Sequence, residues 1–126
     1  MKRPRTFEKL LRSYPAAVRT LAIAARRSLR KWLPGVQEGV DRSVPVVGYG
    51  YGPGYRGMVC TLILSHSGVK LGLVRGSELP DPRGLLEGNG KVHRHVPLSV
   101  AADLRRAGVR ALVKASHAAW RKRNPS

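Results

Sequence analysis

Three strand-like segments follow one another closely in the middle of the chain, and they constrain its fold more than any other feature. They span residues 44–51, 58–65 and 69–75, and each is rich in apolar or β-branched side chains. Short glycine-containing connections, 52–57 and 66–68, separate them. Parallel neighbours need a crossover of about a dozen residues or more, so connections this short predict antiparallel pairing. We therefore expect an antiparallel sheet at the centre of the fold.

Helical patterns precede this sheet. Thr6 can cap a short helix that runs to about residue 13, and Pro15 suits the first turn of a second helix that ends before Pro34. Residues 36–41 can add a further helical turn. Apolar residues recur at helical spacing in the second helix and predict one buried stripe, which consists of Val18, Leu21, Ala25, Leu29 and Trp32.

A fourth strand and a last helix are expected in the C-terminal part. A long loop at 76–89 leads through a glycine-rich turn to a strand at 91–98, and Ser99 can cap a helix that runs to about Lys122. Gly108 falls near the inward face of this helix, where close packing would offset its cost of about 1 kcal/mol relative to alanine. The expected inward residues are Val100, Leu104, Ala111, Ala115 and Ala118, and the expected outward stripe is Arg106, Arg110, Lys114, His117 and Arg121.

The order of helices, strands and helix predicts an α+β fold. We expect an antiparallel sheet of about four to six strands, with the N- and C-terminal helices packed on one face. A chain of 126 residues with 42% hydrophobic residues can bury one core, so 1–126 should form a single domain. The sequence has no apolar leader with a cleavage site and no apolar stretch of membrane-spanning length, which predicts a cytoplasmic protein without a membrane partner.

The charge of the chain is strongly unbalanced. There are 24 Lys and Arg residues against 7 Asp and Glu, which gives a formal net charge of +17. Such a chain attracts nucleic acid or another polyanion. An arginine-rich coding bias with a solvated surface explains the same composition, and composition alone does not decide between the two.

Arginine-rich helical faces support nucleic-acid binding, because stripes of this kind contact phosphates without reading sequence. Tyrosines in the glycine-rich segment 48–57 can stack on unpaired bases. A strand end followed by a hairpin loop, with tyrosines packed on the sheet, explains that segment equally simply. The candidate residues are Arg19, Arg26, Arg30, Arg106, Arg110, Lys114, Arg121, Tyr49, Tyr51 and Tyr55, with Lys2, Arg3 and Arg5 at one terminus and Lys122 and Arg123 at the other.

Residues 71–98 carry a distinctive pattern: Leu71-Gly72-Leu73-Val74-Arg75-Gly76, then Asp81-Pro82, Gly84-Leu85-Leu86-Glu87-Gly88 and Arg94-His95-Val96-Pro97-Leu98. This pattern resembles the signature of the YdhG-like family of uncharacterised bacterial proteins, and weaker similarity extends over 36–118. The resemblance implies a sandwich of the frataxin-like and YjbR-like group, here with a basic helical N-terminal extension and a basic C-terminal tail. It also implies iron as a candidate ligand, because one branch of the family is described as an iron chaperone, but no required cofactor.

The polar residues of this pattern lie on the predicted long loop and its flanking strands. Arg75 and Arg94, on neighbouring strands, can bind a carboxylate or phosphate bidentately. Alternatively, one of them pairs with Asp81 or Glu87 and pins the loop, which is the interpretation we favour because loops of this length need internal ties. The candidate ligand-binding residues are Arg75, Glu78, Asp81, Glu87, Lys91, Arg94 and His95.

A metal site is a weaker alternative at the same place. His93 and His95 are two residues apart on the predicted strand and so share a face. With Asp81 and Glu87 they can supply nitrogen and oxygen ligands to iron or another divalent metal. Histidines of this spacing are more often surface or hydrogen-bonded strand residues, and the basic side chains nearby disfavour a cation.

Familiar catalytic signatures are missing from the sequence. The segment 84–91 is similar to a phosphate loop, but Val92 stands where a Ser or Thr is required. HExxH and CxxC motifs are absent, and the single cysteine, Cys60, lies in an apolar run typical of an inert core thiol. We therefore expect a non-enzymatic binding domain for a small ligand or iron, with accessory nucleic-acid binding as the alternative. Both a monomer and a homodimer remain open.

Overall fold

The computed structural model describes residues 6–41 and 43–125, so the basic residues Lys2, Arg3 and Arg5 lie outside the described part. The chain begins with helices α1 (Phe7–Leu11) and α2 (Ala16–Trp32). The strands are β1 (Gln37–Val40), β2 (Val46–Gly50), β3 (Met58–Ser65), β4 (Gly68–Leu73) and β5 (Arg94–Leu98), with the short helix α3 (Gly54–Gly57) between β2 and β3. The remaining elements are the 3-10 helices η1 (Gly76–Glu78) and η2 (Ala101–Arg105) and the C-terminal helix α4 (Val109–Arg123).

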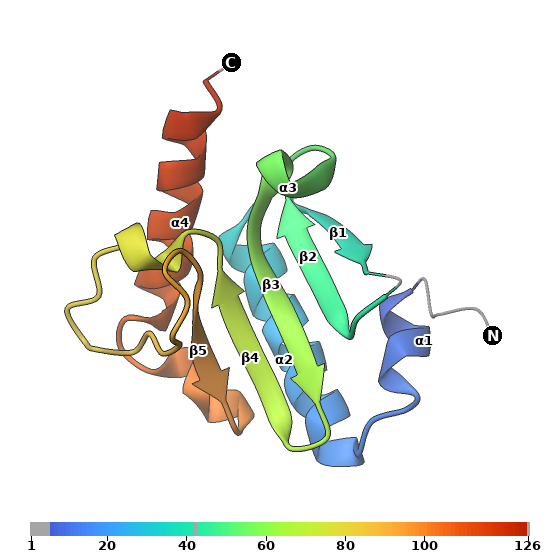
Figure 1. Ribbon diagram of the computed structural model, residues 1–126. Helices are drawn as coiled ribbons and strands as arrows, with labels where there is room; N and C mark the ends of the chain where they lie inside the picture. The colour runs from blue at the N-terminus through green and yellow to red at the C-terminus, as the bar shows by residue number, and fades with distance from the viewer. Residues whose placement is uncertain (1–5, 42, 126) are drawn as a thin grey trace.

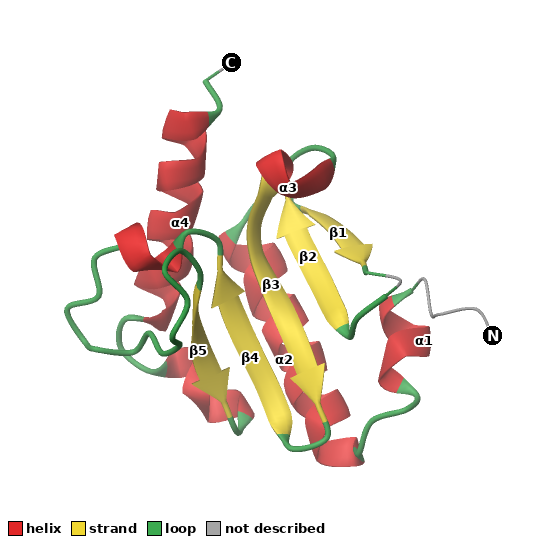
Figure 2. Ribbon diagram, viewed as in Figure 1, coloured by secondary structure: helices red, strands yellow, loops and turns green. Residues whose placement is uncertain are grey.

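The strands form one five-stranded sheet in the order β1-β2-β3-β4-β5, and every neighbouring pair is antiparallel. The helices α2 and α4 both contact β3 and β4 (Figure 1). Figure 2 shows these two helices behind the sheet, so that they leave its near face uncovered. The predicted α+β fold is confirmed, with five strands where four to six were expected.

The core lies between the sheet and the helices, with buried residues from α1, α2 and α4. The whole predicted stripe of α2 is buried: Val18, Leu21, Ala25, Leu29 and Trp32. At the start of α1 the hydroxyl oxygen of Thr6 accepts a hydrogen bond from the N–H of Lys9 at 3.2 Å, as predicted for a helix cap. Cys60 is completely buried in β3, and burial raises the pKa of its thiol to about 12. A thiol held protonated in this way is a poor nucleophile.

The edge strand β1 corrects one prediction, because residues 36–41 were expected to form a helical turn. Gln37–Val40 instead pair with the residues of β2. Glu38 accepts hydrogen bonds from Nε and Nη2 of Arg26 at 2.8 and 2.9 Å and from the O–H of Tyr49 at 2.7 Å. Gln, Glu and Gly have little intrinsic preference for strands, so these long-range partners determine the strand and the local pattern did not indicate it.

The C-terminal helix corrects a second prediction, because it begins at Val109 and not after Ser99. The 3-10 helix η2 comes first, and Gly108 then takes a left-handed conformation (φ +99°) immediately before α4. A side chain at Gly108 would meet Arg83 of the long loop, so the close approach there is to this loop and not to the sheet.

This break also changes which residues of the segment face inward. Val100 is 57% exposed and Ala111 and Ala118 are exposed, although all three were expected inside; Leu104 is buried and Ala115 half-buried. The buried residues of α4 are Val109, Leu112, Val113 and Ser116. Arg106 precedes α4 and so does not extend its stripe, and His117, expected outside, is half-buried. The prediction treated residues 99–122 as one continuous helix, and a continuous helix through Gly108 does not give the buried and exposed residues that the structure has.

Several predicted strands are shorter in the structure. Residues 44–51 contain β2 only from Val46 to Gly50, and β5 begins at Arg94 where residue 91 was expected. The strand expected at 69–75 ends at Leu73, and Arg75 lies beyond it.

In residues 6–41 and 43–125 no helix combines the length and apolar character needed to cross a membrane.

Candidate functional site

A row of five residues, three of them glycines, crosses the uncovered face of the sheet. The ladder pairs place Gly39, Gly48, Thr61, Gly72 and His95 next to one another, one from each strand. Directly paired residues of antiparallel strands share a face. Because glycine has no side chain, the row is a shallow trough across the sheet.

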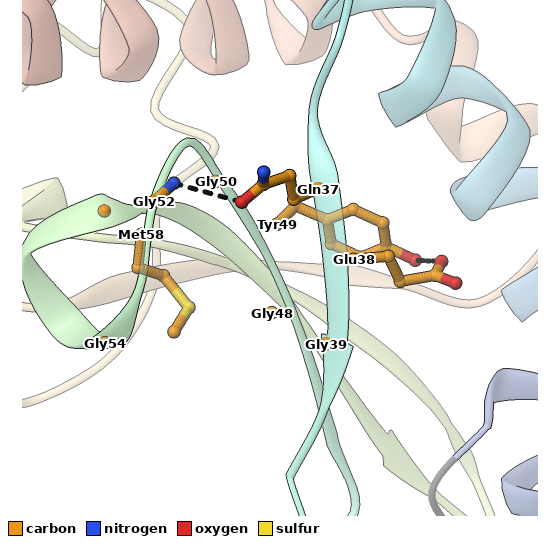
Figure 3. A pocket seen from close by; sticks show the side chains of 10 residues that line it. Gln37, Glu38, Gly39, Gly48, Tyr49, Gly50, Gly52, Gly54 and Met58 are labelled. Atoms are coloured by element: carbon orange, nitrogen blue, oxygen red, sulfur yellow. Dashed lines mark hydrogen bonds between the residues drawn. The ribbon is translucent and has the colours of Figure 1, made fainter.

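Met58 separates two hollows of this trough. Its side chain lies over Gly48, so that a Cβ built on Gly48 would come within 2.7 Å of the methionine sulfur. The hollow on the β1 side has a volume of about 210 Å³ and is lined largely by glycines. Figure 3 shows Glu38 and Tyr49 bonded to each other and pointing away from Met58. This hollow therefore offers mainly backbone and few groups for specific recognition.

The hollow on the β5 side, which we name the sheet cavity, has a volume of about 290 Å³. Its floor is mostly apolar, and polar side chains gather toward β5 and α3. In the described part of the chain, no Asp or Glu lines it. The lining residues are Tyr55, Met58, Thr61, Ile63, Gly72, Leu73, Val74, His93, Arg94 and His95.

Two hydrogen bonds orient His93 at this cavity. The backbone N–H of Arg75 donates to Nδ1 of His93 at 3.0 Å, and Nε2 of His93 lies 3.4 Å from the hydroxyl of Tyr55. A ring nitrogen that accepts carries no proton, so Nε2 bears the hydrogen of the neutral ring. The rings of Tyr55 and His93 meet edge to face, with centroids 5.8 Å apart. His93 therefore presents an N–H donor toward Tyr55.

His95 lies on β5 opposite Gly72. Its backbone N–H and C=O both form hydrogen bonds with the backbone of Glu87. This pair is an isolated β-bridge at the outer side of β5. Partial burial lowers the pKa of His95, the charge of Lys70 lowers it further, and Glu87 opposes these effects. The lowered pKa favours the neutral form of the imidazole.

The structure pins the long loop differently from the interpretation that we favoured. The carboxylate of Asp81 accepts the backbone N–H groups of Leu85 and Leu86, both at 2.9 Å, and Arg75 pairs with Glu78 at 2.6 Å. Among the described ion pairs, none joins an arginine to Asp81 or Glu87.

The predicted joint anion site of Arg75 and Arg94 is also not formed. Arg94 lines the sheet cavity, whereas Arg75 lines a separate hollow beside it. Glu78, Glu87 and Lys91 are exposed and line neither hollow. Of the predicted ligand-binding residues, the sheet cavity therefore unites Arg94 and His95 and adds His93.

The residues present do not fit an iron site. Asp81 is committed to the loop backbone, and Nδ1 of His93 is committed to Arg75. Within the described ranges, no three or more His, Cys, Asp or Glu side chains lie together in a way that could hold a metal ion. Arg94 beside the two histidines would further repel a cation. The predicted set of His93, His95, Asp81 and Glu87 thus has no geometric support.

The tyrosines proposed to stack on bases differ in accessibility. Tyr49 is completely buried, and burial together with Glu38 raises the pKa of its hydroxyl, so it is a core residue. Tyr51 stacks on His117 with ring centroids 4.8 Å apart and donates to the carbonyl of Pro34. Only Tyr55, which is 55% exposed, is open to a ligand.

The predicted arginine stripe of α2 is mostly used within the protein. Arg26 binds Glu38 and Glu8 and lies 4.6 Å above the ring centroid of Phe7. Arg30 reaches Glu38 at 3.4 Å, and Arg19 donates to the carbonyl of Tyr14 at 2.6 Å. The α4 residues Arg110, Lys114 and Arg121, by contrast, are exposed and form none of the described ion pairs.

The acidic side chains do little to neutralise the surface. Apart from Glu87, each acidic side chain already binds a partner within the chain: Glu8 and Glu38 bind Arg26, Asp41 binds Ser43, Glu78 binds Arg75, Asp81 binds the loop backbone, and Asp103 binds the N–H groups of Ser99 and Val100. With 24 Lys and Arg residues against 7 Asp and Glu, the excess positive charge favours an anionic ligand.

His117 provides a pH-dependent contribution to stability. Burial lowers the pKa of its ring, and the charges of Arg121 and Lys114 lower it further. The unfolded chain takes up this proton near pH 6.5, whereas the folded chain does so only at lower pH. Between these two values the unfolded state binds more protons, so the free energy of unfolding falls as the pH falls. Partial burial of His95 acts in the same direction.

We therefore expect His117→Phe, which keeps a ring against Tyr51, to lose less stability on acidification than the parent protein. Urea unfolding at about pH 7.5 and about pH 5.5 measures the difference, because this range spans the ordinary histidine titration. Identical losses in the two proteins would show that His117 is not responsible. His66, which is exposed and for which no such burial exists, serves as the control when it is replaced by Phe.

No family model, curated protein or solved structure gives a significant match to this chain. The YdhG-like resemblance of residues 71–98 consequently stays a prediction. Sequence reasoning missed Met58, Thr61 and Val74 as cavity residues and assigned Tyr55 to a different role. Thr61 and Gly72 each lie on a predicted strand, where alternate residues point to the same face, and this could have placed both on the outer face of the sheet. The sequence does not reveal the strand register that puts these two residues opposite each other.

Proposed function

We propose that this protein is a non-enzymatic binding domain whose ligand is a small organic anion with a flat apolar body, held in the sheet cavity. One observation carries the proposal: the cavity combines an apolar floor with hydrogen-bond donors and has no carboxylate in its lining. A cavity of about 290 Å³ is near the lower end of small-molecule sites, which suits a single ring with one charged substituent.

The arrangement of side chains supports this class of ligand. Ile63, Met58 and the backbone at Gly72 offer apolar contacts to a flat body. Arg94 offers N–H donors toward a carboxylate or phosphate, and the Tyr55 hydroxyl, which accepts from Nε2 of His93, can donate its own hydrogen to the same group. Hydrogen bonds to charged groups are the stronger ones. The positive charge of the whole chain favours the entry of an anion.

Iron handling, which the YdhG-like resemblance implies, is not part of this proposal because the residues near the cavity favour anions. Accessory nucleic-acid binding remains a second candidate. It is supported by Arg110, Lys114 and Arg121, which are exposed on one helix without acidic partners among the described ion pairs. The α2 stripe no longer contributes to it, since Arg26 and Arg30 bind Glu38.

Titration with benzoate, followed by NMR, tests the sheet cavity. We expect the backbone amide signals of Thr61, Gly72 and His95 to shift with benzoate, and to shift much less with uncharged benzyl alcohol of similar shape. The variant Thr61→Phe should abolish the benzoate response, because its ring would cover Gly72 and fill the floor. An aromatic residue opposite a strand glycine is well tolerated.

Thr20→Phe is the matched control, since Thr20 is exposed on α2, away from the uncovered face of the sheet. It should bind benzoate as the parent does. Equal responses to benzoate and benzyl alcohol would reject an anion site. A response that survives in Thr61→Phe would place the ligand elsewhere on the protein.

A further inference from the structure

A second hollow, beside the sheet cavity, is lined by three arginines from three separate segments. Arg56 comes from α3, Arg75 follows the end of β4, and Arg123 is in the last turn of α4. The hollow has a volume of about 210 Å³, and neither Asp nor Glu lines it. Its other lining residues are Tyr55, Met58, Val74 and Asn124. We name this hollow the arginine cleft.

The segments that form the arginine cleft are tied to one another. The indole N–H of Trp120 on α4 donates to the carbonyl of Arg56 at 2.8 Å, which joins α4 to α3. The backbone N–H of Arg75 donates to His93, which joins the end of β4 to the residue before β5. The side-chain amide of Asn124 donates to the carbonyl of Trp120 at 2.9 Å. The backbone around the cleft is therefore fixed before any ligand arrives, which lowers the entropic cost of binding.

Arg75 carries two costs that its neighbours within the chain do not explain. It has the only positive φ (+55°) of a non-glycine residue in the described ranges, a conformation that is uncommon for such residues. Its Nε is buried and has no hydrogen-bond partner in the described chain. Backbone strain and unsatisfied buried donors both concentrate at binding sites.

Among the described ion pairs, Arg75 has one counter-ion, Glu78, and it is weakly held. Nη2 of Arg75 lies 2.6 Å from the carboxylate of Glu78, whose side chain is 52% exposed. An ion pair so open to solvent contributes little, so an anion with more oxygens can compete with it. When the Arg75 guanidinium is released from Glu78, it can turn its Nε edge toward a ligand. The Nε–H, which has no partner in the described chain, then gains a hydrogen-bond acceptor.

We infer that the arginine cleft is a binding site for a phosphate group. Several phosphate oxygens can accept from guanidinium groups that approach from different sides, and the planar fork of arginine matches phosphate geometry. The C-terminal end of α4 carries a partial negative charge, but Arg121, Lys122 and Arg123 in its last turn offset it.

The position of the cleft also suggests the rest of the ligand. The arginine cleft and the sheet cavity share Tyr55, Met58 and Val74, so one molecule can occupy both. A flat ring joined to a phosphate, as in a nucleotide, has the required chemistry. This extension rests on the proposed function of the sheet cavity, whereas the phosphate site itself does not.

Calorimetric titration with inorganic phosphate and with adenosine monophosphate tests the inference. Inorganic phosphate has no apolar body, so its binding reports on the arginine cleft alone. We expect Arg75→Gln to weaken binding of both probes by about tenfold, the effect of one lost charge-assisted hydrogen bond. Arg12→Gln, which removes the same charge from an exposed residue at the end of α1 that does not line the cleft, should change affinity less than about twofold.

Three further variants separate a built site from general charge. Arg75→Lys keeps the charge but loses the fork, so it should weaken binding partway. Glu78→Gln removes the competing carboxylate and should strengthen binding. Arg123 is exposed in the last turn of α4, so Arg123→Gln should leave the core intact. We expect this variant to weaken phosphate binding. Far-UV circular dichroism checks that each variant is folded.

The outcomes distinguish this inference from the proposed function. Thr61→Phe should abolish benzoate binding but leave inorganic phosphate binding intact. Equal losses in Arg75→Gln and Arg12→Gln, or equal affinity for adenosine and adenosine monophosphate, would overturn the phosphate site. Competition with a short oligothymidylate that lacks a terminal phosphate identifies the source of the phosphate group. If adenosine monophosphate displaces the bound oligothymidylate, the cleft accepts the phosphodiester of a strand. If it does not, the cleft selects a phosphate monoester.

Discussion

Replacing Glu38 by alanine is expected to lower the free energy of unfolding by about 3 kcal/mol, the size of effect seen when one partner of a buried ion pair is removed. The Glu38 side chain is only 12% exposed and accepts hydrogen bonds from Arg26 and Tyr49. Without it, the completely buried Tyr49 hydroxyl loses its acceptor, and the Arg26 guanidinium loses its nearer counter-ion and keeps only the exposed Glu8. Urea unfolding of the two proteins measures the difference.

Glu8→Ala is the matched control, because Glu8 binds the same arginine from an exposed position, with its side chain 68% open to solvent. We expect a loss below about 0.5 kcal/mol, as is usual for surface ion pairs. Glu38→Gln should fall between the two, since an amide oxygen can still accept from Tyr49. Similar losses for Glu38→Ala and Glu8→Ala would mean that the network does not hold β1 to the helices.

Replacing Gly50 by alanine should destabilise the fold by about 3 kcal/mol, at the upper end of overpacking effects. A Cβ on Gly50 would overlap the carbonyl oxygen of Gly57 and lie 2.9 Å from the Cα of Met58. Gly50 is at the irregularity where β2 shifts its register against β3, and the same Gly57 carbonyl accepts from Tyr51 at 2.8 Å. The backbone cannot move aside without breaking this hydrogen bond.

Gly39→Ala is the control for Gly50→Ala within the same sheet. A Cβ on Gly39 meets nothing within 4 Å, and its backbone is not in the left-handed region. Its effect should stay within about 0.5 kcal/mol, as for most surface substitutions. Comparable losses in the two variants would show that overlap with the Gly57 carbonyl is not what destabilises Gly50→Ala. Thermal unfolding followed by circular dichroism is sufficient for this comparison.

Hydrophobic periodicity predicted the elements that are long and packed against the core. The stripe of α2 follows directly from its helical period, and strand β3 follows from a continuous run of apolar residues. Strand β1 was missed because its stability comes from Glu38 and its partners, which are distant in sequence. The start of α4 was misplaced because a glycine that ends one helical phase looks, in sequence, like a glycine inside a helix.

The candidate site was predicted only in part. The segment 71–98 does supply Arg94, His93 and His95 to the sheet cavity. The other wall comes from α3 and β3, and its contribution depends on the ladder register that brings Thr61 opposite Gly72. Binding of an anion by Arg75 together with Arg94 was one of two alternatives, but the left-handed Arg75 after β4 directs the chain elsewhere. No local pattern indicates this conformation at an arginine.

The buried thiol of Cys60 can report on opening motions of the fold. It is the one cysteine in the chain, it is completely buried in the central strand, and its pKa is raised to about 12. A thiol-specific reagent can react with it only when β3 separates from α2 and α4. The rate of labelling therefore reports how often the sheet and its helices part, and ligands that bind across the strands will slow that rate in proportion to how strongly they hold the sheet closed.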